Sequence, residues 1–167
     1  MSNYLLPHFG LIDPENLNEY YSTIIKLKGK EISIDINFDK TAIDKSLMDV
    51  IKSFLENIEN YDQQNKQFIN DDYTAKDGDT VRGFVTEHVE GYGDDFLVEL
   101  NIDLNGDKEK QFMDKLHLVR VGLYPDGKYN ASYFAVFDYT VSKELTDQII
   151  AVKTNEKGSL DHLAWES

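Results

Sequence analysis

An unusually acidic segment is the feature of the sequence with the clearest chemical meaning. Between Thr86 and Asp107 the chain carries seven carboxylates and no lysine or arginine. Carboxylates at this density attract cationic partners over long distances, so we take six of them as candidate binding residues for a basic protein partner. The alternative is that they only keep a small protein soluble. The six are Glu87, Glu90, Asp94, Asp95, Glu99 and Asp103.

Two other segments approach known ligand-binding loops without completing them. Asp103, Asn105 and Asp107 fall on the first, third and fifth positions of a calcium loop, but Lys108 stands where the sharp turn requires glycine. The stretch GLYPDGKY has the spacing of a phosphate loop, but Tyr129 replaces the Ser or Thr that ligates magnesium. The four histidines lack metal-ligand spacing, and there is no cysteine. We therefore predict no metal, no cofactor and no catalytic motif.

An enzyme with dispersed catalytic residues is the main alternative function. Asp138 lies between Phe137 and Tyr139 in FAVFDYT, which makes it a candidate for a buried functional carboxylate. An ion pair between Asp138 and Arg120 on neighbouring strands is a simpler interpretation, and we favour it. Catalysis would also require a deep pocket with perturbed titratable groups. The sequence favours a non-enzymatic protein over such an enzyme.

A third possible function is a homo-oligomeric structural module. Such a protein would associate through the sheet face that points away from the helices. Ile24, Tyr124 and Phe134 are expected to be exposed on that face, where apolar side chains would form a contact surface. A strictly monomeric protein would exclude this possibility.

Overall charge and composition limit the kinds of partner and compartment. The 167 residues include 31 acids and 17 bases, for a formal net charge of −14, which argues against nucleic acid and anionic membranes as partners. Most of this charge lies in residues 41–116, with 18 acids and 8 bases. The absence of cysteine, of an export signal in MSNYLLPHFG and of any apolar run of about 20 residues predicts a cytoplasmic protein.

The first half of the chain predicts a hairpin followed by helices. Apolar residues alternate on a period of two through residues 20–38, and a two-residue loop at Gly29 and Lys30 is expected to set Leu27 opposite Ile32. The same register sets Ile25 opposite Ile34 and Tyr21 opposite Phe38. The period then changes to three and four between Ile43 and Ile58, which predicts a helix with Thr41 as N-cap and Asp44 as its capping partner. Further helices are expected over 61–73 and 81–89.

The second half predicts strands. Alternation from Phe96 to Leu104 favours a strand, after which Asp107 is expected to cap a short helix through Leu116, with a returning strand as the alternative. A hairpin should follow that pairs Val121 with Phe137, Val119 with Tyr139 and Arg120 with Asp138. QIIAVKT and SLDHLAW form a last hairpin around NEKG.

These elements together predict an α+β fold. We expect a largely antiparallel sheet of about seven strands, made of the N-terminal hairpin, a helical stretch and a C-terminal five-strand meander, with helices on one face. The length and the 41% hydrophobic content suit a single domain over residues 1–167.

Several segments resemble a bacterial family known only as domain-of-unknown-function family two-thousand-and-four. They are HFGLID at His8–Asp13, the hairpin YYSTIIKLKGKEISIDINF, LYPDG at Leu123–Gly127, VFDYTVSKELTDQIIAVKTNEKG at Val136–Gly158, and the final WES. The resemblance spans nearly the whole chain but is weakest from Gly91 to Lys110, so the acidic segment is expected to be particular to this protein. It implies no catalytic residue. By analogy, such small acidic domains are similar to immunity proteins that neutralise a toxin.

Overall fold

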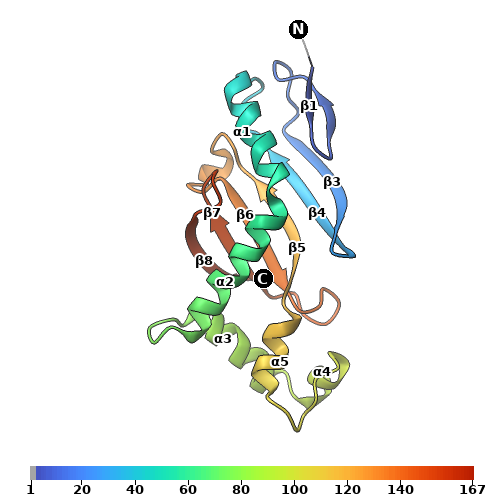
Figure 1. The fold of residues 1–167 in the computed structure, drawn as a ribbon, viewed down its shortest axis with the longest axis vertical. Coiled ribbons are helices and arrows are strands. Elements are labelled where there is room, and N and C mark those ends of the chain that lie inside the picture. The colour runs from blue at the N-terminus through green and yellow to red at the C-terminus, as the bar shows by residue number, and fades with distance from the viewer. Residues whose placement is uncertain (1–2) are drawn as a thin grey trace.

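A six-stranded mixed sheet forms the centre of the computed structural model, which describes residues 3–167 (Figure 1). The strands lie side by side in chain order. The pair β4–β5 is parallel and every other neighbouring pair is antiparallel. A parallel pair needs a long crossover, and the helices between these two strands provide it. The strands are β3 (Tyr20–Leu27), β4 (Lys30–Asn37), β5 (His117–Leu123), β6 (Ala135–Thr140), β7 (Ile149–Thr154) and β8 (Leu160–Glu166).

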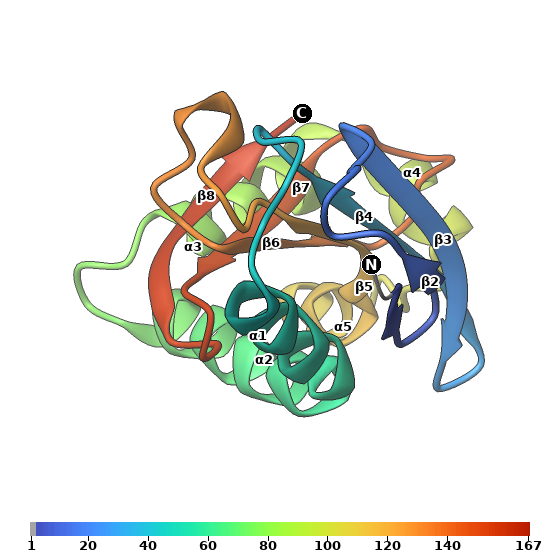
Figure 2. The same cartoon turned by 90° about the horizontal axis from the view of Figure 1, so that it is seen from above.

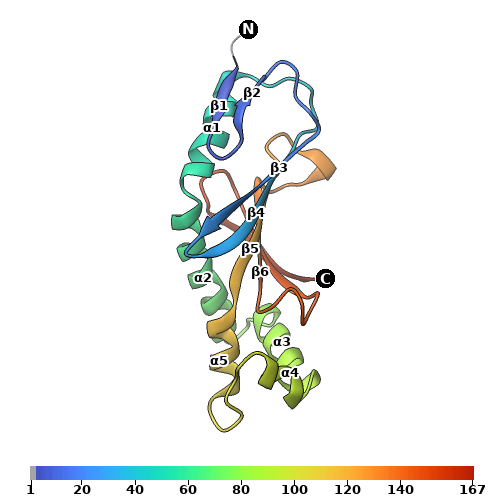
Figure 3. The ribbon, with the colours of Figure 1, turned by 90° about the vertical axis from the view of Figure 1, so that its right-hand side faces the viewer.

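Helices cover one face of this sheet and extend beyond one end of it. The helices α1 (Lys45–Glu56) and α2 (Ile58–Thr74) lie along one face (Figure 2). Four shorter elements gather at the end of the molecule farthest from the N-terminal hairpin, and we call them the helical end (Figures 1 and 3). They are α3 (Thr80–Thr86), the π-helical turn η1 (Glu87–Gly91), α4 (Asp94–Glu99) and α5 (Lys108–Lys115). The N-terminal hairpin is β1 (Tyr4–Leu6) with β2 (Gly10–Ile12), and a 3-10 turn, η2 (Lys128–Asn130), follows β5.

The predicted α+β class is confirmed. Residues 3–167 contain five α-helices and eight strands rather than seven, because the β1–β2 hairpin adds two unexpected strands and the strand predicted from Phe96 to Leu104 does not form. None of the helices among these residues is both long enough and apolar enough to span a bilayer.

The core lies between the sheet and the two long helices. Ile34 and Ile36 of β4 point toward α1, whose Met48, Ile51 and Phe54 are fully buried. Burial of each such side chain stabilises the fold by roughly 1.5–3 kcal/mol. The helix begins at Lys45, later than predicted. Its N-cap is Asp44 and not Thr41, because the Asp44 carboxylate accepts a hydrogen bond from the Leu47 amide at 2.9 Å. Local hydrogen bonding thus sets where the helix starts.

The first predicted hairpin forms, but its register is wrong by two residues. Its two-residue loop is Lys28–Gly29, with φ of 52° and 80°. Hairpin turns of this type need positive φ at both central residues, and glycine is favoured as the second of them. The shift is even, so the same side chains still face the core. The predicted pairs Leu27–Ile32, Ile25–Ile34 and Tyr21–Phe38 are replaced by Leu27–Lys30, Ile25–Ile32 and Tyr21–Ile36.

The strand predicted from Phe96 to Leu104 is wrong, because the chain forms α4 there. In a strand Val98 would face the same side as Phe96, but Val98 is 55% exposed whereas Leu97 is fully buried. A short apolar run fits either period, so its pattern cannot separate the two structures. Positive φ at Asn101 ends the helical segment. The helix predicted after Asp107 is confirmed as α5, and the Asp107 carboxylate caps it through the Lys110 amide at 3.0 Å.

The C-terminal hairpins agree with the prediction except at one bulge. Val121 pairs with Phe137 and Arg120 pairs with Asp138, as expected. The predicted pair Val119–Tyr139 is wrong, because the register shifts between Leu118 and Arg120 and Leu118 takes the place opposite Tyr139. An extra residue in one strand produces such a bulge. The final hairpin is confirmed as β7 and β8.

One buried polar side chain is expected to limit the stability of the fold. Asn65 on α2 is fully buried, and neither polar atom of its amide has a hydrogen-bond partner among residues 3–167. An unpaired buried polar group costs about 1–3 kcal/mol. We expect Asn65→Leu, which keeps the branched shape and the number of side-chain heavy atoms, to raise the free energy of unfolding by about 1 kcal/mol in urea denaturation. Asn70→Leu on the exposed side of α2 should give no comparable gain, and a net loss in Asn65→Leu would contradict the argument.

Candidate functional site

All six predicted partner-binding carboxylates are exposed at the helical end (Figures 1 and 3). Two lie on η1, three on α4 and one in the turn that follows α4. These elements are adjacent to one another, so the carboxylates are not spread around the molecule. They are Glu87 and Glu90 on η1, Asp94, Asp95 and Glu99 on α4, and Asp103 in the turn.

Few basic residues neutralise these carboxylates. Among residues 3–167, Asp94 is the only one of the six with an ion pair, to Lys108 Nζ at 3.8 Å. The nearby Lys110 is already paired with Asp114 at 3.0 Å. Residues 75–116 contain eleven acids and five bases. The helical end therefore keeps a net negative charge that is open to solvent.

Part of this acidic surface surrounds a hollow of about 670 Å³, which we call the acidic hollow. Four carboxylates line it, and Lys108 is its one basic residue. Tyr73, from the end of α2, donates a hydrogen bond to the Glu109 carboxylate, and this bond raises the pKa of Tyr73 to about 12. The side chains of residues 3–167 form no group of three or more ligands arranged to hold a metal ion. The four carboxylates belong to Glu90, Asp94, Asp107 and Glu109.

The acidic hollow contains only part of the predicted set. Glu90 and Asp94 lie in it, whereas Glu99 lines a different cavity. The sequence analysis missed Tyr73 and Glu109 as members of the site. Glu109 stood outside the lysine-free segment, and Tyr73 reaches the site only because the end of α2 packs beside α5. The spacing of residues along the sequence does not indicate that Tyr73 or Glu109 belongs to this site.

A buried histidine fixes the backbone that carries Glu87 and Glu90. His88 on η1 is fully buried, and its Nδ1 lies 2.8 Å from the Phe84 carbonyl oxygen. A carbonyl can only accept, so Nδ1 carries the proton and Nε2 accepts from the Thr146 hydroxyl at 3.0 Å. Burial lowers the pKa of His88. His88 is therefore a core histidine with both ring nitrogens hydrogen-bonded.

Four aromatic rings pack around the His88 imidazole. The Tyr92 ring stacks on the imidazole with 4.5 Å between centroids, and the Phe84 ring lies at 4.4 Å. Phe96 and Phe112 lie at 5.8 and 5.3 Å. Contacts with α3, α4 and α5 therefore meet at one side chain. The acidic surface is held by a packed cluster and not by a loose loop.

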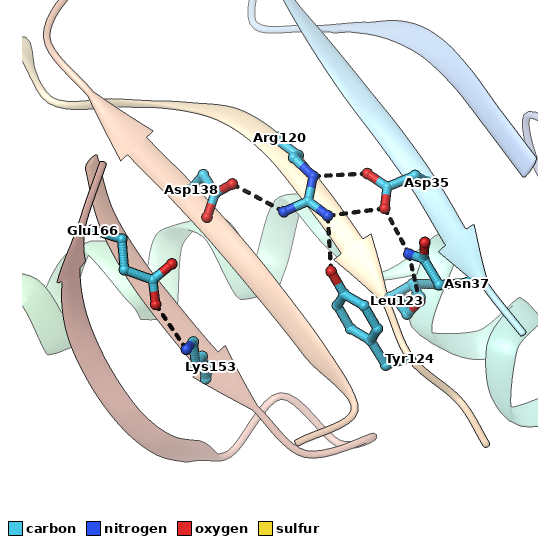
Figure 4. Close-up of polar contacts among 8 residues, drawn as sticks. All are labelled: Asp35, Asn37, Arg120, Leu123, Tyr124, Asp138, Lys153 and Glu166. Atoms are coloured by element: carbon cyan, nitrogen blue, oxygen red, sulfur yellow. Dashed lines mark hydrogen bonds and ion pairs between the residues drawn. The ribbon is translucent and has the colours of Figure 1, made fainter. Parts of the chain in front are cut away.

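The second candidate site, around Arg120 and Asp138, is an ion cluster on the sheet face opposite the helices (Figure 4). The Arg120 guanidinium donates to both Asp35 oxygens, from Nε at 2.8 Å and from Nη2 at 2.9 Å. Its Nη1 donates to Asp138 at 3.1 Å, and Nη2 also donates to the Tyr124 hydroxyl at 3.0 Å. Asp35 and Asp138 are 4% and 7% exposed. The predicted Arg120–Asp138 ion pair is confirmed, and Asp35 is a partner that the sequence analysis missed.

The residues of this cluster satisfy one another's charges and hydrogen bonds. Burial raises the pKa of Asp138. Every nitrogen of the guanidinium has an acceptor. Gly122 leaves the space that the guanidinium fills, because a Cβ added there would lie 2.4 Å from Nη2. The five main cavities within residues 3–167 are lined by residues other than Arg120 and Asp138. The geometry therefore supports a structural ion cluster over a catalytic role for Asp138.

The predicted contact surface on this face is smaller than expected. Ile24 is exposed on β3, at 66%. Phe134 is not exposed, because its ring turns to the helix side and packs on Phe54 with 5.1 Å between centroids. Tyr124 is half-buried through its bond to Arg120. Two of the three side chains proposed for a homo-oligomer contact are thus part of the fold itself.

Comparison with known proteins gives no relative for this chain. No protein-family model, no curated protein and no solved structure matches it. The resemblance to family two-thousand-and-four therefore stays a prediction. The function has to be argued from the geometry of the chain itself.

Proposed function

We propose that this chain is a non-enzymatic binding domain whose helical end recognises a basic protein, as an immunity protein recognises a toxin. The observation that supports this most is the acidic hollow. Glu90 from η1, Asp94 from α4 and Asp107 and Glu109 from the start of α5 surround one opening with a single lysine, Lys108. Three elements supply these carboxylates, so the negative charge is concentrated by the fold and not only by the sequence.

The acidic hollow suits a lysine or arginine side chain of the partner. A guanidinium presents several donors that carboxylates accept as short charge-assisted hydrogen bonds. Four exposed carboxylates outside the hollow make no ion pair among residues 3–167 and extend the negative field. They are Glu87, Asp95, Glu99 and Asp103. Such a field steers a basic protein toward the surface and raises the rate of association. A nuclease toxin fits this chemistry because its active site has to attract polyanions.

The test is to capture partners from a lysate of the source organism with the immobilised chain and to measure affinity against ionic strength. The site variant is Glu90→Gln, Asp94→Asn and Asp107→Asn combined, in which asparagine keeps the cap of α5. The control changes charge equally at exposed positions elsewhere, with Glu31→Gln, Glu56→Gln and Glu156→Gln. The captured partner is expected to be basic, and the site variant should bind it on the order of 100-fold more weakly.

Salt provides the second discriminating measurement. Association with the wild-type chain should slow as salt rises, because screening shortens the range of the field to about 8 Å at physiological ionic strength. The control variant should stay within about threefold of the wild type. Equal losses in both variants, or binding that is indifferent to salt, would leave only a solubilising role for the acidic segment.

A further inference from the structure

A basic groove lies where β4 and β5 begin, apart from the acidic hollow. The parallel pairing of β4 with β5 brings the first residues of the two strands, Lys30 and His117, to one end of the sheet, where both line one cavity. The cavity there has a volume of about 670 Å³. We define the basic groove by four of its lining residues, which come from four separate elements: Lys30, Lys66, Lys115 and His117.

Two of the three lysines in this groove have no ion-pair partner among residues 3–167. Lys30 and Lys115 form no ion pair with any of residues 3–167, and neither does the adjacent Lys143. Lys66 is fixed in place by Asp62 at 3.4 Å, a buried carboxylate that also accepts a hydrogen bond from Tyr139 at 2.7 Å.

The His117 imidazole offers the groove a further donor when its ring is protonated. Its Nδ1 lies 2.9 Å from the Lys115 carbonyl oxygen, so Nδ1 carries the proton of the neutral ring and Nε2 has no hydrogen-bond partner among residues 3–167. Burial, together with the positive charges of Lys30, Lys66 and Lys143, lowers the pKa of His117. A nearby anion would oppose this effect and favour the protonated ring, whose Nε2 then donates.

We propose that the basic groove binds the oxyanion of a small molecule, a phosphate or a carboxylate group, through Lys30, Lys115 and His117. The cavity volume lies in the range of small-molecule sites, about 300–1,000 Å³. Glu99, Asp114 and Glu144 also line the cavity, and Asp114 is already paired with Lys110 at 3.0 Å. These acids, with the net charge of −14, exclude a long polyanion and leave room for one anionic group beside the lysines. The groove shares Glu99 with the proposed partner-binding surface but no residue with the acidic hollow, and the proposal does not rest on the proposed function.

The test follows the His117 ring by NMR during a pH titration in inorganic phosphate, in acetate and in chloride at matched ionic strength. Phosphate or acetate is expected to raise the pKa of His117 relative to chloride, and the effective salt identifies the oxyanion. His8 and His162, which are exposed and lie outside the groove, serve as internal controls in the same spectra. Equal behaviour of His117 in all three salts would overturn the proposal.

Lysine variants test whether anion binding depends on Lys30 and Lys115. Lys30→Met and Lys115→Met should each weaken binding of the effective anion by about three- to tenfold, as expected for the loss of one partly exposed charge. Neither lysine has an ion-pair partner whose loss would unfold the chain. Lys157→Met, at an exposed lysine in the turn before β8, should leave the affinity within about twofold. Equal affinity for Lys30→Met, Lys115→Met and wild type would also overturn the proposal.

Discussion

Replacing Arg120 with methionine is expected to lower the free energy of unfolding by about 3 kcal/mol, measured by urea denaturation near pH 7. The substitution removes the one cation that contacts both Asp35 and Asp138, which stay almost completely buried. An unpaired buried carboxylate is much less favourable than a paired one. Methionine keeps most of the aliphatic length of arginine, so the loss of packing is small by comparison.

Two controls separate the charge effect from a general effect of the substitution. Arg82→Met removes an exposed arginine that donates to the Tyr73 and Ala75 carbonyl groups, and it should cost less than about 1 kcal/mol. Adding Asp35→Asn and Asp138→Asn to Arg120→Met should recover most of the lost stability, because no buried charge then remains. If the triple variant is no more stable than Arg120→Met, the unpaired carboxylates are not the cause.

The pH dependence of the Arg120→Met variant has a defined sign. Burial raises the pKa of Asp138 above the ordinary value of an aspartate, and loss of the guanidinium raises it further. At a pH between the Asp138 pKa of the unfolded state and the higher pKa of the folded state, the folded state binds more protons. The free energy of unfolding therefore increases as pH falls through the folded-state pKa. The gap between variant and wild type should therefore narrow from about pH 7 to about pH 4. A constant gap would contradict the assignment.

The position of this ion cluster explains why its effect is large. Asp35, Arg120 and Asp138 lie on β4, β5 and β6, so the cluster ties the parallel pair to the antiparallel strands that follow (Figure 4). β4 and β5 are separated in the chain by the whole helical stretch, and their pairing carries a large loop-closure entropy. Polar contacts that fix this pairing add to the hydrophobic contacts on the helix side.

Local periodicity was enough to predict most of the elements. The first hairpin, the helices α1 and α2 and the last hairpin all follow from spacing of two, three or four along continuous segments. The pairing of Val121 with Phe137 and of Arg120 with Asp138 was also accessible, since a short connection restricts the register. The exposure of the six acidic residues follows from their charge alone.

Contacts between distant segments were not accessible from the sequence. No periodic pattern in the sequence indicates that β4 and β5 pair in parallel. The contact between Asp35 and Arg120, which are 85 residues apart, was therefore not predicted. The bulge between Leu118 and Arg120 and the helix α4 have no unique local signature either. For the same reason the acidic hollow could be predicted only as a charged segment, and Tyr73 and Glu109 emerged from the packing of α2 beside α5.

The second large effect is expected at His88, the buried residue behind the acidic surface. His88→Ala should lower the free energy of unfolding by about 3–5 kcal/mol, as for other large aromatic core residues. The change removes contacts with four aromatic rings and both hydrogen bonds, to Phe84 and Thr146. Urea denaturation measures this loss. His162→Ala, at an exposed ring, should stay within about 0.5 kcal/mol of wild type.

The neutral state of His88 also predicts how the wild-type stability changes with pH. Because burial lowers its pKa below 6.5, the unfolded state binds more protons than the folded state when pH falls under that value. The contribution of His88 is therefore complete above about pH 6.5 and is lost as pH falls toward the folded pKa. His117 acts in the same direction, since burial lowers its pKa as well. A His88→Gln variant should lose the His88 share of this slope between roughly pH 7.5 and pH 5 and keep the His117 share.

Hydrogen exchange connects this stability to the proposed binding surface. His88 joins η1 to the neighbouring helices and to Thr146, so its loss should raise amide exchange in residues 87–99 more than in β6 or β7. If partner binding depends on carboxylates held in fixed positions, His88→Gln should bind more weakly although every carboxylate of the acidic hollow is retained. Unchanged affinity in a variant with raised exchange would show that the charge of this segment matters and its rigidity does not.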